Sequence, residues 1–179
     1  MKNHNNILRL VISALCLALA YVLPFLTGQI PEIGKMLLPM HIPVLICGFI
    51  CGWKYGLYIG FMAPIIRSLT QSVPIPYPNA VCMAVELAVY GAMAGLLYKL
   101  LPKKKIYIYI SLFGAMVLGR IAYGISMTMC MGMAGKSYAF SAFISSALTG
   151  AIPGIIIQII LVPILVMALK SKRGLKLND

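Results

Sequence analysis

Acidic residues are almost missing from this chain of 179 residues. Glu32, Glu86 and Asp179 are its three acids, against 15 lysines and arginines. An active site of paired carboxylates, or a metal centre that needs several of them, therefore has too few ligands. The basic excess does not predict nucleic-acid binding, because the basic residues lie at the ends of apolar segments.

Charge of either sign is scarce as well. Charged residues make up 10% of the sequence and hydrophobic residues 61%, whereas a soluble domain averages about 25% and 45–50%. The runs 36–49 and 152–169 contain no charged side chain. The composition therefore predicts an all-α integral membrane protein whose main solvent is the lipid bilayer.

Metal-binding and disulfide patterns are missing too. The five cysteines stand in apolar stretches without a C-x-x-C spacing, and His41 has no second histidine or acid at ligand spacing. The cysteines are Cys16, Cys47, Cys51, Cys82 and Cys130. We interpret the cysteines as packing residues. We therefore expect no metal site, no cofactor and no catalytic residue in this protein.

Six apolar segments are long enough, or nearly so, to cross a bilayer as helices. They are 7–26, 36–51, 55–70, 80–101, 106–133 and 139–169. The first follows Lys2 and Arg9 as a signal peptide would, but cleavage after Ala20 would fall inside the apolar run, so we expect it to be retained. The sequence predicts six transmembrane helices in a single domain, residues 1–179.

Lysine and arginine set the expected orientation. With six spans, one side of the membrane holds eleven basic residues, and the other holds only Lys35 and Lys136. The eleven are Lys2, Arg9, Lys54, Lys99, Lys103, Lys104, Lys105, Lys170, Lys172, Arg173 and Lys176. Because cytoplasmic loops carry the positive excess, we expect both termini in the cytoplasm.

Small residues recur at a spacing of four. Gly48, Gly52, Gly56 and Gly60 form one series, and Gly91 with Gly95 and Gly150 with Gly154 repeat it. Ala14 and Ala18 give the first segment a pair of the same kind. Such spacing lets membrane helices approach closely, so it predicts helix packing.

Three ionisable residues stand inside apolar segments, where an unpaired charge costs several kcal/mol. They are Arg67, Glu86 and Arg120. Counting along each helix places all three in the outer half of the membrane. We expect them to converge on one cavity below the outer loop that holds Gln29, Glu32 and Lys35. The alternative is a Glu86–arginine pair that only locks two helices together.

The second segment carries the most specific local pattern. Residues 40–48 read MHIPVLICG and residues 51–56 read CGWKYG, with Arg67 in the following helix. This run resembles the substrate-binding S component of energy-coupling-factor (ECF) transporters, in its riboflavin- and pantothenate-type subgroup. The sequence departs from that pattern at His41 and at Trp53. Ala14 and Ala18 match the A-x-x-x-A pair that is common in the first helix of this family.

The resemblance implies a vitamin importer of several subunits. The S component would capture a vitamin or related micronutrient from outside the cell and dock, through Ala14 and Ala18, on a transmembrane coupling subunit with two cytoplasmic ATPases. The chain would then be no enzyme and would lie in the cell membrane of a bacterium or archaeon. The expected substrate-binding residues are Gln29, Glu32, Lys35, Arg67, Asn79, Glu86, Arg120 and Tyr123.

Two other classes of protein are alternatives to an S component. A secondary transporter or channel that acts as an oligomer is the alternative, although the halves of the chain show no repeat. An intramembrane enzyme lacks a nucleophile or metal constellation. For the substrate, the basic excess of the outer half favours a pantothenate-like anion, while its aromatic residues would equally suit a flavin.

Overall fold

The computed structural model describes residues 2–27, 38–102, 104–133, 135 and 152–173, and these residues form helices without any strand. The elements are α1 (Lys2–Val22), η1 (Leu23–Thr27), α3 (His41–Cys51), α4 (Trp53–Gln71), η2 (Pro76–Ala80), α5 (Val81–Leu100), α6 (Lys105–Met133) and α8 (Ile152–Arg173). The all-helical fold expected from the composition is confirmed.

Residues 139–151 of the last predicted segment lie outside the described residues, and each of the six segments contains one of the described α-helices. Four of them are long and apolar enough to cross a membrane: Asn6–Phe25, Pro76–Leu100, Lys105–Met133 and Ile152–Lys170. The segment predicted at 36–51 yields the shorter helix α3, and α4 is not among these four candidates. The count of six spans and the cytoplasmic termini therefore remain predictions.

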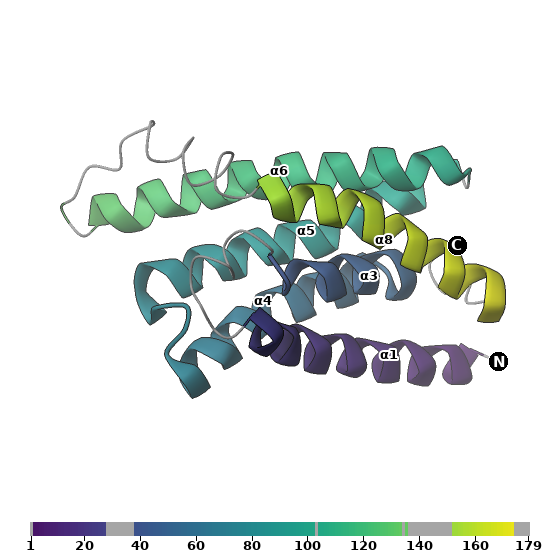
Figure 1. The fold of residues 1–179 in the computed structure, drawn as a ribbon, viewed down its shortest axis with the longest axis horizontal. Helices are drawn as coiled ribbons and strands as arrows, with labels where there is room; N and C mark the ends of the chain where they lie inside the picture. Colours follow the sequence, from purple (N-terminus) through teal and green to yellow (C-terminus); the bar gives the residue numbers. More distant parts are fainter. Residues whose placement is uncertain (1, 28–37, 103, 134, 136–151, 174–179) are drawn as a thin grey trace.

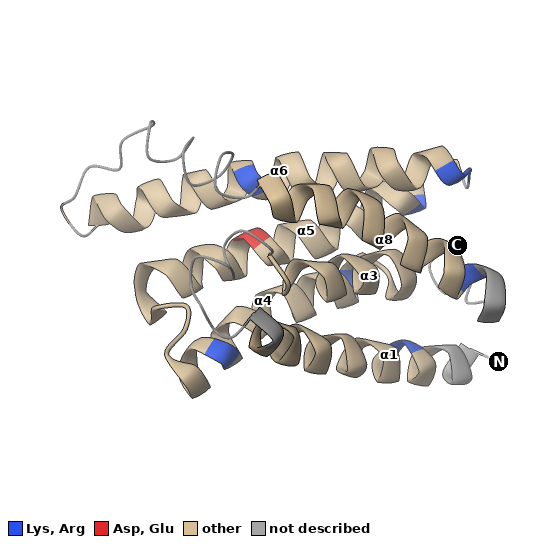
Figure 2. Ribbon diagram, in the orientation of Figure 1, with Lys and Arg blue, Asp and Glu red and all other residues tan. Residues whose placement is uncertain are grey.

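The helices lie side by side along the long axis of the molecule (Figure 1). In this view α1 forms the lower edge, α6 the upper edge, and α8 runs across the front. The first turn of α1 and the last turn of α8 lie at the same end (Figure 1). Most described lysines and arginines gather at this end as well (Figure 2). We call it the basic end and the opposite one the far end.

Glycines lie where α3 leads into α4 and where α4 packs against α5. α3 ends at Cys51 and α4 begins at Trp53, and Gly52 between them has a φ of 101°, which glycine adopts without strain. A Cβ on Gly56 would overlap the carbonyl oxygen of Gly91, and one on Gly60 would overlap that of Leu87. Backbone therefore meets backbone between α4 and α5, as the spacing of small residues predicts.

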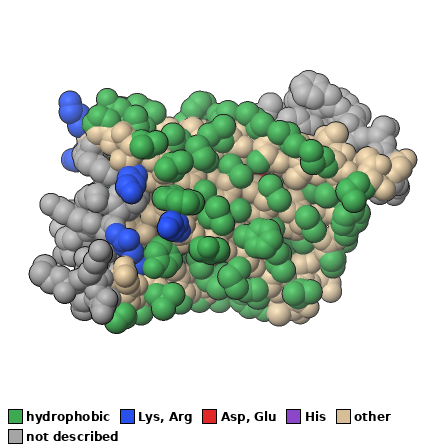
Figure 3. All heavy atoms as spheres, turned by 180° about the vertical axis from the view of Figure 1, so that it is seen from behind, with side chains coloured by type: hydrophobic (Ala, Val, Ile, Leu, Met, Phe, Trp, Pro, Cys, Tyr) green, Lys and Arg blue, Asp and Glu red, His purple; other side chains and the backbone are tan. Residues whose placement is uncertain are grey.

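The outer surface is apolar over the middle of the bundle. Large hydrophobic side chains such as Leu15, Phe113 and Ile160 are more than half exposed. Figure 3 shows this apolar surface with basic side chains restricted to one end. Such a belt is the surface that a lipid bilayer covers, so the structure supports a multi-pass membrane protein.

Candidate functional site

An ion pair between α5 and α6 forms the centre of the candidate site. Arg120 Nη1 lies 2.9 Å from Glu86 Oε1, with 3% of the glutamate and 14% of the arginine side chain exposed. α5 and α6 pack against each other along their length, which brings the two side chains together. An isolated charge at this depth would cost several kcal/mol, so each residue makes the other tolerable.

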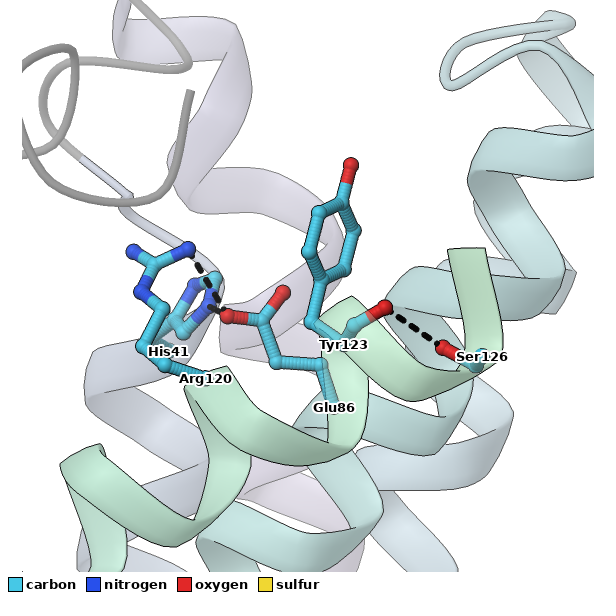
Figure 4. A network of polar contacts seen from close by, with 5 residues as sticks. All are labelled: His41, Glu86, Arg120, Tyr123 and Ser126. Atoms are coloured by element: carbon cyan, nitrogen blue, oxygen red, sulfur yellow. Dashed lines mark hydrogen bonds and ion pairs between the residues drawn. The ribbon is translucent and has the colours of Figure 1, made fainter. Parts of the chain in front are cut away.

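His41 approaches the same carboxylate from α3. Its Nε2 lies 3.7 Å from Glu86 Oε1, and the side chain is fully buried. Its ring meets the ring of Tyr90 edge-on, with centroids 5.1 Å apart and an interplanar angle of 90°. Figure 4 shows Arg120 and His41 converging on one oxygen of Glu86 while the other oxygen points away from both. We call His41, Glu86, Tyr90 and Arg120 the polar cluster.

The polar cluster retains hydrogen-bonding capacity. Among the residues that the structure describes, neither ring nitrogen of His41 has a hydrogen-bond partner, and the same holds for Arg120 Nε and Nη2. Buried groups of this kind are expensive when left unpaired. Because Glu86 already balances the charge of Arg120, the cluster can donate and accept hydrogen bonds while its net charge is near zero with a neutral histidine.

Tyr123 follows Arg120 by three residues and thus lies on nearly the same face of α6. Its backbone carbonyl accepts a hydrogen bond of 2.9 Å from Ser126 Oγ (Figure 4). Asn79 is half-buried in η2, which joins directly to α5. Along the chain, Asn79 comes seven residues before Glu86, and Tyr123 comes three residues after Arg120.

Arg67 belongs to a different contact. It is buried, and its Nε donates a hydrogen bond of 3.1 Å to the carbonyl oxygen of Val73. Within the described residues no ion pair joins Arg67 to Glu86. The three ionisable residues of the sequence therefore separate into a Glu86–Arg120 pair and an arginine that holds the connection between α4 and η2.

Three of the predicted site residues, Gln29, Glu32 and Lys35, lie outside the described residues, as does Lys136. The structure also adds two residues that the predicted set lacked. The sequence favours a helix-packing or hydrogen-bonded role for His41 over a metal ligand, and it places Tyr90 within an apolar segment. A histidine within the charge-free run 36–49 was the available hint, but which helix it would face depends on the packing.

The predicted docking residues, Ala14 and Ala18, are both exposed on α1. They line a groove of about 410 Å³ between α1 and α4. The other lining residues are Leu17, Tyr21, Val22, Ala63, Ile66 and Thr70. Tyr21 OH donates to Thr70 Oγ1 at 3.2 Å and accepts from Gln71 Nε2 at 3.1 Å, which closes one end of the groove.

These features define a class: a helical membrane protein with a buried polar cluster between its helices and with a separate apolar groove on its surface. The chain matches the family "ECF transporter, substrate-specific component" over residues 8–166. It therefore belongs to this family. No curated protein and no solved structure matches it significantly.

Membership in this family gives the general role of the protein. Substrate-specific components are the substrate-binding subunits of ECF transporters and not enzymes, and they associate with coupling and ATPase modules. In the described part of the chain, no group of three histidine, cysteine or acidic residues could hold a metal ion. The chemistry available to the polar cluster is hydrogen bonding and charge pairing.

Proposed function

We propose that this protein captures a vitamin or related micronutrient from outside the cell and delivers it through an ATP-driven ECF importer. The observation that carries the proposal is the polar cluster, an ion pair with a buried histidine inside apolar helices of a chain from this family. A coupling subunit and two cytoplasmic ATPases would supply the energy. The host would be a bacterium or archaeon, with the protein in its cell membrane.

The proposed topology has six spans, with the basic end in the cytoplasm and the polar cluster in the outer half of the membrane. The gathering of lysines and arginines at the end where the first turn of α1 and the last turn of α8 lie supports it (Figure 2). α3 has 11 residues, or about 16 Å of helix, which is less than the bilayer core. Nine of its residues are buried against other parts of the protein, so the length of α3 does not need to match the thickness of the bilayer core.

Cysteine labelling tests this topology. In a Cys130→Ser background, we expect Lys104→Cys to react with a membrane-impermeant maleimide only from the cytoplasmic side. Met133→Cys, at the far end of α6 and highly exposed, should react only from outside. Reaction of Lys104→Cys from outside would rule out the proposed orientation.

The substrate site is proposed to combine the polar cluster with the remaining predicted residues. Glu86, Arg120 and Tyr123 would face the ligand, and Gln29, Glu32 and Lys35 would cap it from the outer loop. Arg67 would act by fixing the Val73 carbonyl, and thereby the segment that leads to Asn79. The ligand would be a pantothenate-like anion or a flavin, the two types that the residues of the outer half favour.

The groove at Ala14 and Ala18 is the proposed docking surface for the coupling subunit. Two small residues on one face of an exposed helix allow a partner helix to approach at backbone distance. The groove is almost wholly apolar in lining, which suits a helix that meets it inside the membrane. The chain would function as a single domain that moves as one body against this partner.

Copurification tests the function as a whole. We expect affinity-tagged protein, extracted from its native membrane in mild detergent, to bring down one membrane coupling subunit and ATPase subunits. Proteoliposomes that hold the tagged chain alone should show no uptake of riboflavin or pantothenate. Sustained uptake by the chain alone, without ATPase subunits in the extract, would replace the proposal with an oligomeric secondary transporter.

A further inference from the structure

A glutamine lies buried in the apolar helix α8. Gln158 of α8 is fully buried, and among the described residues neither its amide oxygen nor its amide nitrogen has a hydrogen-bond partner. Burying an unpaired amide is costly, and such a group in a folded protein calls for an explanation. The surrounding run 152–169 contains no charged residue that could pair with it.

Two aromatic contacts between α3 and α5 fix the depth of the polar cluster. Phe49 packs edge-on against Tyr98, with centroids 5.5 Å apart. His41 packs against Tyr90 in the same way, and both residues come eight positions earlier on their own helix. α3 and α5 therefore run parallel and in step from the basic end up to the polar cluster.

A contact between α5 and α8 extends this register to the third helix. Lys170 Nζ donates a hydrogen bond of 2.9 Å to Tyr98 OH. Gln158 comes twelve residues before Lys170, and Glu86 twelve residues before Tyr98. At 1.5 Å per residue, both lie about 18 Å from that contact. To within about one turn, Gln158 and Glu86 are at the same depth.

Gln158 also lies on the inward face of its helix. It shares a four-residue spacing with Val162 and Val166, which are fully buried in the same core cluster as Tyr90. α8 packs on α3 and α6, the two helices that carry His41 and Arg120. Four helices thus each place one polar side chain at one level of an otherwise apolar bundle.

We propose that Gln158 is a further substrate-binding residue and that the ligand it reads is uncharged, with an N–H donor beside a carbonyl acceptor, as in a ring amide or ureide. This inference rests on the proposed function. A primary amide offers one acceptor and one donor group in a single plane, which complements that edge of a ligand. Arg120 Nε and Nη2 and the ring nitrogens of His41 would supply further hydrogen-bond partners.

Charge balance is the reason to prefer an uncharged ligand. The positive charge of Arg120 is already matched by Glu86 at 2.9 Å. A ligand carboxylate that entered beside Arg120 would meet the Glu86 carboxylate in a medium of low dielectric, where like charges repel strongly. A neutral amide can use the open nitrogens of Arg120 and His41 without that penalty.

A pair of substitutions tests the role of Gln158. Gln158→Met keeps the length of the side chain and removes both amide groups. We expect it to raise the melting temperature of the ligand-free protein, because an unpaired buried amide is removed, and to weaken ligand binding about tenfold or more. Loss of binding with a gain in stability is a combination that a merely structural glutamine would not give.

Ser111→Ala is the matched control. Ser111 is fully buried on α6, and its hydroxyl has no partner among the described residues. It comes nine residues before Arg120, about 13 Å toward the basic end. We expect the same small gain in melting temperature as for Gln158→Met, with ligand binding unchanged.

The ligand is measured in two ways. Mass spectrometry of the small molecule that copurifies with the parent protein gives its charge, and thermal shifts are recorded with riboflavin, panthenol and pantothenate. The last two differ only in an alcohol that replaces the carboxylate. We expect an uncharged copurified molecule, a shift with a neutral probe no smaller than with pantothenate, and loss of both in Gln158→Met.

The outcomes separate this inference from the proposed function. A bound carboxylate, or a larger shift with pantothenate than with panthenol, overturns the uncharged ligand class. Unchanged ligand retention in Gln158→Met removes Gln158 from the site. Both results leave the transporter role intact if ATPase subunits copurify. A parent protein that binds neither a small molecule nor ATPase subunits would overturn the proposed function together with this inference.

Discussion

The same spacing of small residues occurs in two regions of this protein with opposite outcomes. Between α4 and α5 the glycines are buried, and each contacts the backbone of the other helix. On α1, Ala14 and Ala18 are exposed and line a groove instead. The glycine spacing is satisfied within the chain, whereas the alanine spacing leaves a surface for a partner. A small-residue pattern predicts close approach, and only the fold shows what approaches.

The two regions also differ in what holds their helices together. Backbone contact between α4 and α5 leaves no room for any side chain at Gly56 or Gly91. α1 is attached to α4 at one end by the hydrogen bonds of Tyr21 with Thr70 and Gln71. We therefore expect substitutions in the first region to affect folding, and substitutions on α1 to affect assembly with a partner.

The largest expected effect is at Gly91. Gly91→Leu drives a side chain into the backbone of Gly56 and should cost more than about 3 kcal/mol, the upper range for overpacking. Fluorescence-detected size-exclusion chromatography should show almost no folded protein. Gly132→Leu, where a Cβ would meet nothing within 4 Å, is the control and should fold like the parent.

The second largest effect on stability is expected at the ion pair between Arg120 and Glu86. Arg120→Met leaves Glu86 buried without its partner and should lower stability by about 3 kcal/mol, as measured by thermal unfolding in detergent. The double variant Arg120→Met with Glu86→Gln should recover at least half of that loss. A single variant as stable as the parent would show that Glu86 does not depend on Arg120.

A smaller effect is expected where α1 meets α4. Tyr21→Phe removes the hydroxyl that bridges Thr70 and Gln71, and these partly exposed bonds are worth about 0.5–1.5 kcal/mol in total. The melting temperature should fall by a few degrees. A loss as large as that of Gly91→Leu would mean that α1 is as tightly integrated as the central helices.

The smallest expected effect on folding is at Ala18. Because Ala18 is exposed in the groove, Ala18→Trp should change the free energy of unfolding by less than about 0.5 kcal/mol. The same variant should abolish copurification of the coupling subunit and uptake by the assembled transporter, while ligand binding stays intact. Parallel loss of binding and uptake would place Ala18 in the fold of the binding site instead.

Much of the fold could be predicted from the sequence. Helix positions follow from runs of apolar residues, and each of the six predicted segments contains a described α-helix, with residues 139–151 of the last segment outside the described part. The bounds at 36–51 were less accurate: α3 begins at His41, five residues later than predicted. Hydropathy marks apolar stretches but not where a helix starts within them.

The candidate site was predictable only in part. Glu86 and Arg120 stood out because buried charge is costly and needs a partner. Their pairing with each other, and the engagement of Arg67 with Val73, depend on which helix faces carry them. His41 and Gln158 are uncharged polar residues in apolar runs, so composition alone gave them little weight.

The sequence by itself determined the solvent, the helical content and the family of this protein, because hydropathy, scarcity of acids and local motifs are properties of the chain in order. The tertiary structure decided which small residues are buried and which form a groove, and which polar side chains meet. Those outcomes depend on the rotation and register of helices far apart in the sequence. Such helices, α3, α5 and α6, bring His41, Glu86 and Arg120 together, and the register of α8 places Gln158 within about one turn of their depth.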